Sequence, residues 1–172
     1  EAAHQLLRTT TTLVRTWLEA QLETVRTAEG ILVLDDIVGF LSLDDYREFA
    51  HPYLREIFGA FPQSLKCFHN DTNNPVSFGC YAELGIRVFN FTHLQPLDKV
   101  RQLVGPEMCL MGNVPPLEVL AKGTPDAVRQ SVAELRGLHP ATQGWLLSAG
   151  GGTSPGTPVE NIQALVAAAR SQ

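Results

Sequence analysis

The sequence predicts an α/β fold in which short apolar strands alternate with helices around a parallel sheet. Two observations support this prediction: five apolar runs of strand length recur along the chain, and stretches with helical spacing separate them. Parallel strands are covered on both faces and therefore read as continuous apolar runs, as these do. The pattern fits a doubly wound sheet or part of a (β/α)8 barrel, and periodicity alone does not choose between them.

The chain opens with an expected helix at residues 4–28, where apolar residues such as Leu6, Val14 and Leu22 recur at spacings of three and four. Gly30 marks its end. The strand candidates follow at 31–34, 65–68, 86–89, 108–111 and 145–148. The helix candidates between and after them lie at 43–60, 74–84, 95–104, 116–121, 125–137 and 158–170.

Several of these helices begin with residues that favour a helix start. Ser42 is followed three residues later by Asp45, the hydroxyl and carboxylate spacing of a capping box. Thr124 and Thr157 each precede a proline, and proline is favoured at the first helical position. These local patterns support the alternation of strands and helices.

Composition limits the class of protein. The 172 residues are 44% hydrophobic and 18% charged, which suits one globular domain, and the net charge of -5 argues against a nucleic-acid partner. Three cysteines, an odd number within apolar runs, favour reduced thiols in the cytoplasm. No uncharged apolar stretch reaches membrane-spanning length, so we expect no membrane segment. The chain starts at Glu1 rather than Met, and we expect residues upstream of it.

Polar residues follow every strand candidate, at the ends that meet at one mouth in either architecture. The alternative is that each strand must end in some polar loop, whatever its function. The residues that we expect around a shared mouth are Asp35, Asp36, His69, Asn70, Asp71, Asn90, Thr92, His93, Asn113 and Gly150 to Thr153.

Cys67, His69 and Asp71 alternate along one strand, which places them on one face. Thiolate, imidazole and carboxylate are all ligands that zinc accepts. Alternatively, Cys67 is a small core residue, and His69 orients a substrate or bonds to the backbone.

Asp35 and Asp36 are adjacent, so only one of the two is expected to enter the mouth. We select Asp35, as a general acid or base or as a partner for a cationic substrate. The alternative for Asp35 is a structural carboxylate that caps a helix or pairs with arginine.

The glycine-rich segment 148–161 permits close approach of the backbone to a ligand and is a candidate anion site. A purely structural turn is the alternative for this segment.

The order and spacing of several motifs resemble the C-terminal half of the uroporphyrinogen decarboxylase superfamily. The resemblance implies that residues 1–172 form the C-terminal part, about strands 4 to 8, of a single (β/α)8 barrel domain whose N-terminal part is absent, and that the protein is a homodimer. The residues that support it are Asp35, Gly39, Leu41, Ser42, Phe49, Pro52 to Leu54, His69, Gly112 to Pro116, Leu120, Gly123 to Pro125, Gly150 to Gly152, Pro155, Thr157, Pro158, Glu160 and Asn161.

The superfamily contains two chemistries, and this chain departs from the motifs of both. Its decarboxylases remove carboxylates from tetrapyrroles without a cofactor and typically carry Gly-His-Gly after the last strand, where this chain has Gly151 in place of histidine. Its methyltransferases carry His-x-Cys and a later cysteine as zinc ligands. Here His69 matches, while Asp71 and Gly151 replace the two cysteines. An oxygen ligand would favour a substrate oxygen over a sulfur.

We therefore expect a corrinoid-linked methyltransferase or demethylase that acts on a small methylated compound, with the corrinoid carried by a partner protein. Asp35, His69 and Asp71 are the expected catalytic residues, and His69 and Asp71 the expected zinc ligands. Two alternatives are a cofactor-free uroporphyrinogen decarboxylase and a non-catalytic truncated barrel. The expected substrate-binding residues are Asn90, His93, Asn113, Gly150, Gly151, Gly152 and Thr153.

Overall fold

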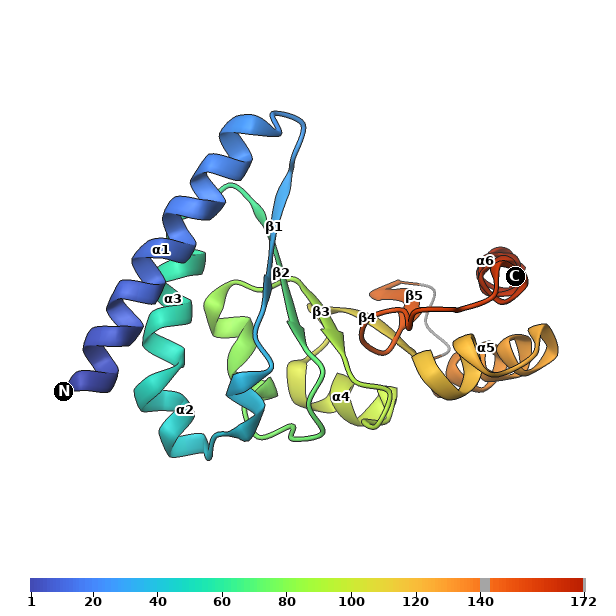
Figure 1. Ribbon diagram of the computed structural model, residues 1–172. Helices are drawn as coiled ribbons and strands as arrows, with labels where there is room; N and C mark the ends of the chain where they lie inside the picture. The colour runs from blue at the N-terminus through green and yellow to red at the C-terminus, as the bar shows by residue number, and fades with distance from the viewer. Residues whose placement is uncertain (140–142, 172) are drawn as a thin grey trace.

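The fold is a five-stranded parallel sheet in a computed structural model that describes residues 1–139 and 143–171. Each strand pairs with the next one in the chain, so the sheet order is β1-β2-β3-β4-β5 (Figure 1). A doubly wound sheet reverses its strand order at a switch point, whereas the strands of a (β/α)8 barrel follow one another in order. The observed order is therefore that of a barrel segment. The strands are β1 (Gly30–Leu34), β2 (Leu65–Asn70), β3 (Val88–Phe91), β4 (Cys109–Val114) and β5 (Trp145–Ala149).

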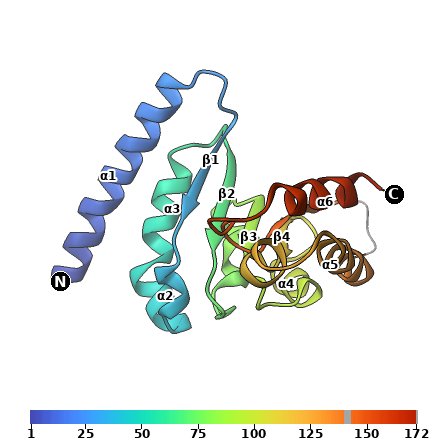
Figure 2. The same cartoon turned by 45° about the vertical axis from the view of Figure 1, so that its right-hand side comes forward.

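Helices precede, connect and follow the strands, and α1, which comes before β1, runs beside α3 in both views (Figures 1 and 2). Within the described residues, none of these helices is both long enough and apolar enough to cross a membrane. The α-helices are α1 (Ala2–Thr24), α2 (Leu43–Phe49), α3 (His51–Gly59), α4 (Leu97–Val104), α5 (Pro125–Leu138) and α6 (Val159–Arg170). Shorter helical turns are η1 (Ile37–Phe40), η2 (Phe78–Leu84) and η3 (Pro116–Ala121).

The helix expected at 43–60 is two helices, because the backbone leaves helical geometry at Ala50, with φ -123° and ψ -55°. Pro52 has no N–H to donate to the preceding turn, and its ring would clash with the carbonyl four residues earlier. In the first turn of a new helix neither problem arises, and α3 places Pro52 there. The expectation of one continuous helix was therefore wrong.

The main core lies between the sheet and the helices. Phe68, Phe89 and Leu110 stand side by side on neighbouring strands, and each is fully buried. Phe58 of α3 and Tyr81 of η2 belong to the same core cluster. This layer of aromatic side chains fixes the helices on one face of the sheet.

The opposite face of the sheet is open. One residue from each strand lies in a continuous row across it, and Leu34 and Leu146, at the two ends of the row, are 65% and 50% exposed. In a closed barrel this face lines the interior. The row therefore places its two polar members, His69 and Asn90, on the inner face. In order from β1 to β5 the row is Leu34, His69, Asn90, Met111 and Leu146.

Candidate functional site

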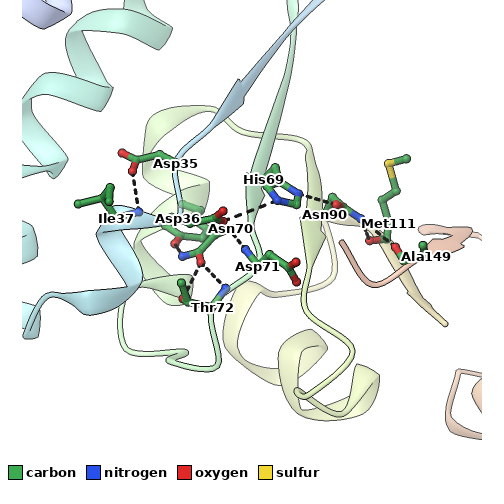
Figure 3. Close-up of polar contacts among 11 residues, drawn as sticks. Asp35, Asp36, Ile37, His69, Asn70, Asp71, Thr72, Asn90, Met111 and Ala149 are labelled. Carbon is green, nitrogen blue, oxygen red and sulfur yellow. Dashed lines mark hydrogen bonds and ion pairs between the residues drawn. The ribbon is translucent and has the colours of Figure 1, made fainter. Parts of the chain in front are cut away.

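His69 lies at the carboxyl end of β2 and is held by Asn90, its register partner on β3. The Nδ1 atom of His69 lies 2.6 Å from Oδ1 of Asn90 (Figure 3). The amide nitrogen of Asn90 donates to the carbonyl oxygens of Met111 at 2.7 Å and Ala149 at 3.3 Å. Because these two acceptors fix which end of the amide is nitrogen, Oδ1 faces the ring and Nδ1 of His69 carries the hydrogen. Asn90 thus orients the imidazole.

The other ring nitrogen of His69 faces a carboxylate. Its Nε2 atom lies 3.6 Å from Oδ1 of Asp36, and the same oxygen accepts a hydrogen bond of 2.7 Å from the backbone N–H of Asp71. Asp36 therefore links the end of β1 to the residue that follows β2 (Figure 3). We call Asp36, His69, Asp71 and Asn90 the His69 cluster.

Asp35 does not join this cluster, so the expectation that Asp35 enters the mouth was wrong. Leu34 is the register partner of His69, and alternation along the chain therefore gives the face of His69 to Asp36. The Asp35 carboxylate accepts a hydrogen bond of 3.0 Å from the N–H of Ile37 and lines an apolar cavity of about 290 Å³ against α1. The register that pairs Leu34 with His69 decides between the two carboxylates, and alternation along the chain alone does not supply that register.

Burial raises the pKa of Asp35 above its usual value, and hydrogen bonds from the backbone N–H groups of Val38 and Ile37 oppose that shift. Desolvation of a carboxylate favours its neutral form. The Asp35 side chain is therefore a partly buried acid outside the His69 cluster.

Asp71 is the second carboxylate of the cluster, and its pKa is also raised. Burial is the main cause, the neighbouring His69 opposes the rise, and the Asp36 carboxylate adds to it. A carboxyl group in this environment gives up its proton at higher pH than an exposed one does. Burial therefore favours the neutral form of the Asp71 carboxyl group.

Gly151 packs directly on Asp71. Its φ is +107°, and a Cβ atom there would come within 2.3 Å of Oδ2 of Asp71. The family resemblance aligns three positions with zinc ligands: His69, Asp71 and Gly151. In the structure these positions belong to neighbouring parts of one site. The glycine keeps the last loop close to the Asp71 carboxylate without a side chain between them.

The rest of the glycine-rich loop packs on protein. A Cβ atom at Gly150 would come within 2.5 Å of the backbone nitrogen of His93. Gly152 has open space around it, and Thr153 is exposed. The first two glycines therefore permit contact between chain segments. Binding of substrate or of an anion by Gly150 to Thr153 stays a prediction.

His93 and Asn113 line a second cavity beside the His69 cluster. The amide nitrogen of Asn113 donates to the carbonyl oxygens of Thr92 at 3.2 Å and Gln95 at 2.8 Å. In the described part of the chain, no hydrogen bond of Asn113 or His93 reaches the cluster. The shared mouth stays a prediction.

The donor set does not complete a zinc centre. Three protein ligands are usual for a catalytic zinc ion, and residues 1–139 and 143–171 contain no group of three His, Cys, Asp or Glu side chains placed to hold a metal. In His69, Nδ1 is already engaged by Asn90. Zinc ligation by His69 and Asp71 stays a prediction, and we derive no step through a metal.

The His69 cluster is acidic. Asp36 faces Nε2 of His69, and within the described segments neither Asp36 nor Asp71 forms an ion pair with lysine or arginine. The carboxylates of these residues attract cationic groups and repel anionic ones.

Comparison with known proteins identifies the family. The family model described as "Uroporphyrinogen decarboxylase (URO-D)" matches residues 1–172. The chain belongs to the uroporphyrinogen decarboxylase family. A uroporphyrinogen decarboxylase of Chlorobium phaeobacteroides is 30% identical over 172 residues, covering 95% of this chain and 47% of the relative. The enzyme of the same name from Sorangium cellulosum is 30% identical over 168 residues, covering 96% and 47%.

The fold also matches a solved structure, a methyltransferase from Methanosarcina mazei, with a TM-score of 0.80 and 24% identity. That match covers 92% of this chain and 46% of the methyltransferase. The chain thus spans about half the length of the relatives that it matches. Its five parallel strands are those of a partial (β/α)8 barrel, as the sequence predicts.

Proposed function

We propose that this member of the family takes part in methyl transfer from a small methylated compound and that the His69 cluster holds the heteroatom that bears the methyl group. One observation supports this proposal above the others: His69 is held between the amide of Asn90 and the carboxylate of Asp36, and the same carboxylate oxygen accepts a hydrogen bond from the N–H of Asp71. Such a site suits a neutral or cationic compound.

In this proposal Asn90 and Asp36 position the cluster, and Asp71 delivers a proton. Asn90 keeps Nδ1 of His69 as a hydrogen-bond donor, so the imidazole keeps one orientation. Asp36 holds the backbone of Asp71 in place. When the methyl group leaves, its bonding electron pair stays on the substrate heteroatom, which then takes a proton. Asp71 supplies that proton as the general acid, because burial favours its protonated form.

The methyl acceptor comes from outside this chain. A corrinoid carried by a partner protein would supply the nucleophile that accepts the methyl group. The residues of this chain bind the substrate, orient it and deliver the proton.

Decarboxylation of uroporphyrinogen is the second candidate, because the curated relatives carry that name at 30% identity. A substrate with several carboxylates needs cationic partners to hold it. Gly151, at the position where the decarboxylases have histidine, weakens this candidate.

Activity assays of the complete gene product separate the two candidates. We expect consumption of cob(I)alamin with at least one member of a panel of methoxy-aromatic compounds and methylamines, followed by absorbance. We expect no coproporphyrinogen after prolonged incubation with uroporphyrinogen. Formation of coproporphyrinogen, with no methyl transfer from any compound of the panel, would refute the proposal.

A further inference from the structure

A second cavity, of about 200 Å³, lies between the loop after β3 and helix α5. It is lined by residues other than those of the His69 cluster. His93 and Asn113 contribute polar atoms from the sheet side, while Ser131 and Glu134 contribute them from α5. The methyl-transfer proposal does not use this cavity.

Two buried polar atoms in its lining have no hydrogen-bond partner within the part of the chain that the structure describes: Oδ1 of Asn113 and Nδ1 of His93. Asn113 is only 3% exposed. The amide nitrogen of Asn113 donates to the carbonyl oxygens of Thr92 and Gln95. The unpaired atom is therefore the amide oxygen, which is an acceptor. A buried acceptor without a donor is costly, and native proteins usually satisfy it with a ligand or with water.

The remaining lining favours a cation that donates several hydrogen bonds. Glu134 contributes a carboxylate, one oxygen of which accepts a hydrogen bond of 3.0 Å from Gln130. No lysine or arginine is among the residues that line the cavity. In the tautomer with hydrogen on Nε2, Nδ1 of His93 is also an acceptor. The two unpartnered atoms and the exposed Glu134 carboxylate suit a ligand that donates several hydrogen bonds, such as a primary ammonium group.

The rest of the wall is apolar. Leu97, Leu135 and Leu138 line the cavity together with two prolines. An aliphatic stem attached to the ammonium group would contact these side chains, and the volume admits a stem of only a few carbons. Pockets with a few convergent polar groups and an apolar wall are typical small-molecule sites.

We propose that this cavity binds a small primary ammonium compound with a short aliphatic stem, whose nitrogen donates to Asn113, His93 and Glu134. The bound compound joins the loop after β3 to helix α5. Because that loop follows directly from Asn90, its occupant also stabilises the segment next to the His69 cluster. The binding site itself is independent of which reaction the His69 cluster performs.

The test is titration of the complete gene product with n-butylammonium, followed by NMR of the asparagine side-chain amides and by thermal shift. We expect saturable binding with a shift of the Asn113 amide signal. n-Butanol, which lacks the charge, should bind about tenfold more weakly, and tetramethylammonium, which lacks N–H donors, should not bind.

Two variants on α5 locate the binding. Glu134→Gln should weaken n-butylammonium binding at least about fivefold by removing the charge, and Ser131→Leu should abolish it by filling the cavity. Glu107→Gln removes an exposed carboxylate elsewhere and should leave binding unchanged. No saturable binding to the wild type, or equal binding by wild type, Glu134→Gln and Ser131→Leu, would overturn the proposal, because then water alone occupies the cavity.

Discussion

At the scale of single residues, the direction in which a side chain points decides its role. Asp35 and Asp36 are neighbours in the chain, yet one lies against α1 and the other against His69. The sequence correctly predicted that only one carboxylate would enter the site. The choice between them depends on which residue of β1 pairs with His69, and a single sequence does not contain that register.

A carboxylate with a raised pKa makes stability depend on pH. Asp35 binds its proton more tightly in the folded chain than in the unfolded one, so its contribution to stability is complete below its unfolded pKa and is lost as the pH rises through its folded pKa. Asp35→Asn removes this loss. The unfolding free energy of the variant relative to that of the wild type should therefore be larger at pH 7 than at pH 3.5. Urea unfolding at the two pH values would measure this difference.

Glu19→Gln is the control for this experiment, because Glu19 is exposed on α1. Its stability relative to the wild type should be the same at both pH values. If the difference in unfolding free energy between Asp35→Asn and the wild type stays constant from pH 3.5 to pH 7, burial does not shift the pKa of the Asp35 carboxyl group.

Gly151 offers a second test at this scale. Alanine there would take up a strained positive φ and would push against Asp71, so we expect Gly151→Ala to cost about 1–3 kcal/mol of unfolding free energy. Gly152→Ala is the matched control, because nothing lies within 4 Å of its added Cβ. Equal unfolding free energies for the two variants in chemical denaturation would contradict the close packing of Gly151 on Asp71.

At the scale of elements, helix boundaries follow from short-range chemistry. The Ser42 hydroxyl accepts a hydrogen bond from the N–H of Asp45 at 3.1 Å and donates to its carboxylate at 2.7 Å, as the capping pattern predicts. By contrast, the helix predicted at 74–84 is helical only from Phe78 to Leu84. Asn74 is held by contacts with the carbonyl oxygens of Gly39 and Leu41, which are distant in sequence and therefore invisible to local pattern.

The cap at Ser42 makes a measurable contribution. Ser42→Ala removes the acceptor for an otherwise unpaired N–H at the start of α2, and we expect a loss of about 1 kcal/mol of unfolding free energy. Thr12→Ala, within the exposed part of α1, should cost less, since its hydroxyl bonds only to a carbonyl of its own helix. Thermal denaturation of both variants would measure this difference, and a larger loss for Thr12→Ala would contradict the assigned cap.

At the scale of the whole molecule, the alternation of strands and helices was enough to predict a parallel sheet, and the family motifs were enough to predict a barrel segment. The arrangement of polar groups on the sheet was harder to predict. Polar residues do gather at the strand ends, but they divide between the His69 cluster and the cavity beside α5. That division depends on where α5 packs, which residues distant in the chain determine.

The inner face of the sheet carries part of the candidate site. It is exposed at Leu34 and Leu146, and it carries His69 and Asn90 between them. Since the relatives are about twice as long as this chain, activity has to be measured in the complete gene product. The prediction at this scale is that methyl transfer depends on the residues of the inner face and is independent of those on the helix-covered face.

The most direct test of the account is the rate of methyl transfer to cob(I)alamin in three variants of the complete gene product: His69→Ala, Asp36→Asn and Asp35→Asn. We predict that the first two lose at least about a hundredfold in rate, within the usual range for acid–base and positioning groups, while Asp35→Asn keeps the wild-type rate. Loss of activity in Asp35→Asn with retention in Asp36→Asn and His69→Ala would contradict the assignment of the His69 cluster as the reactive site.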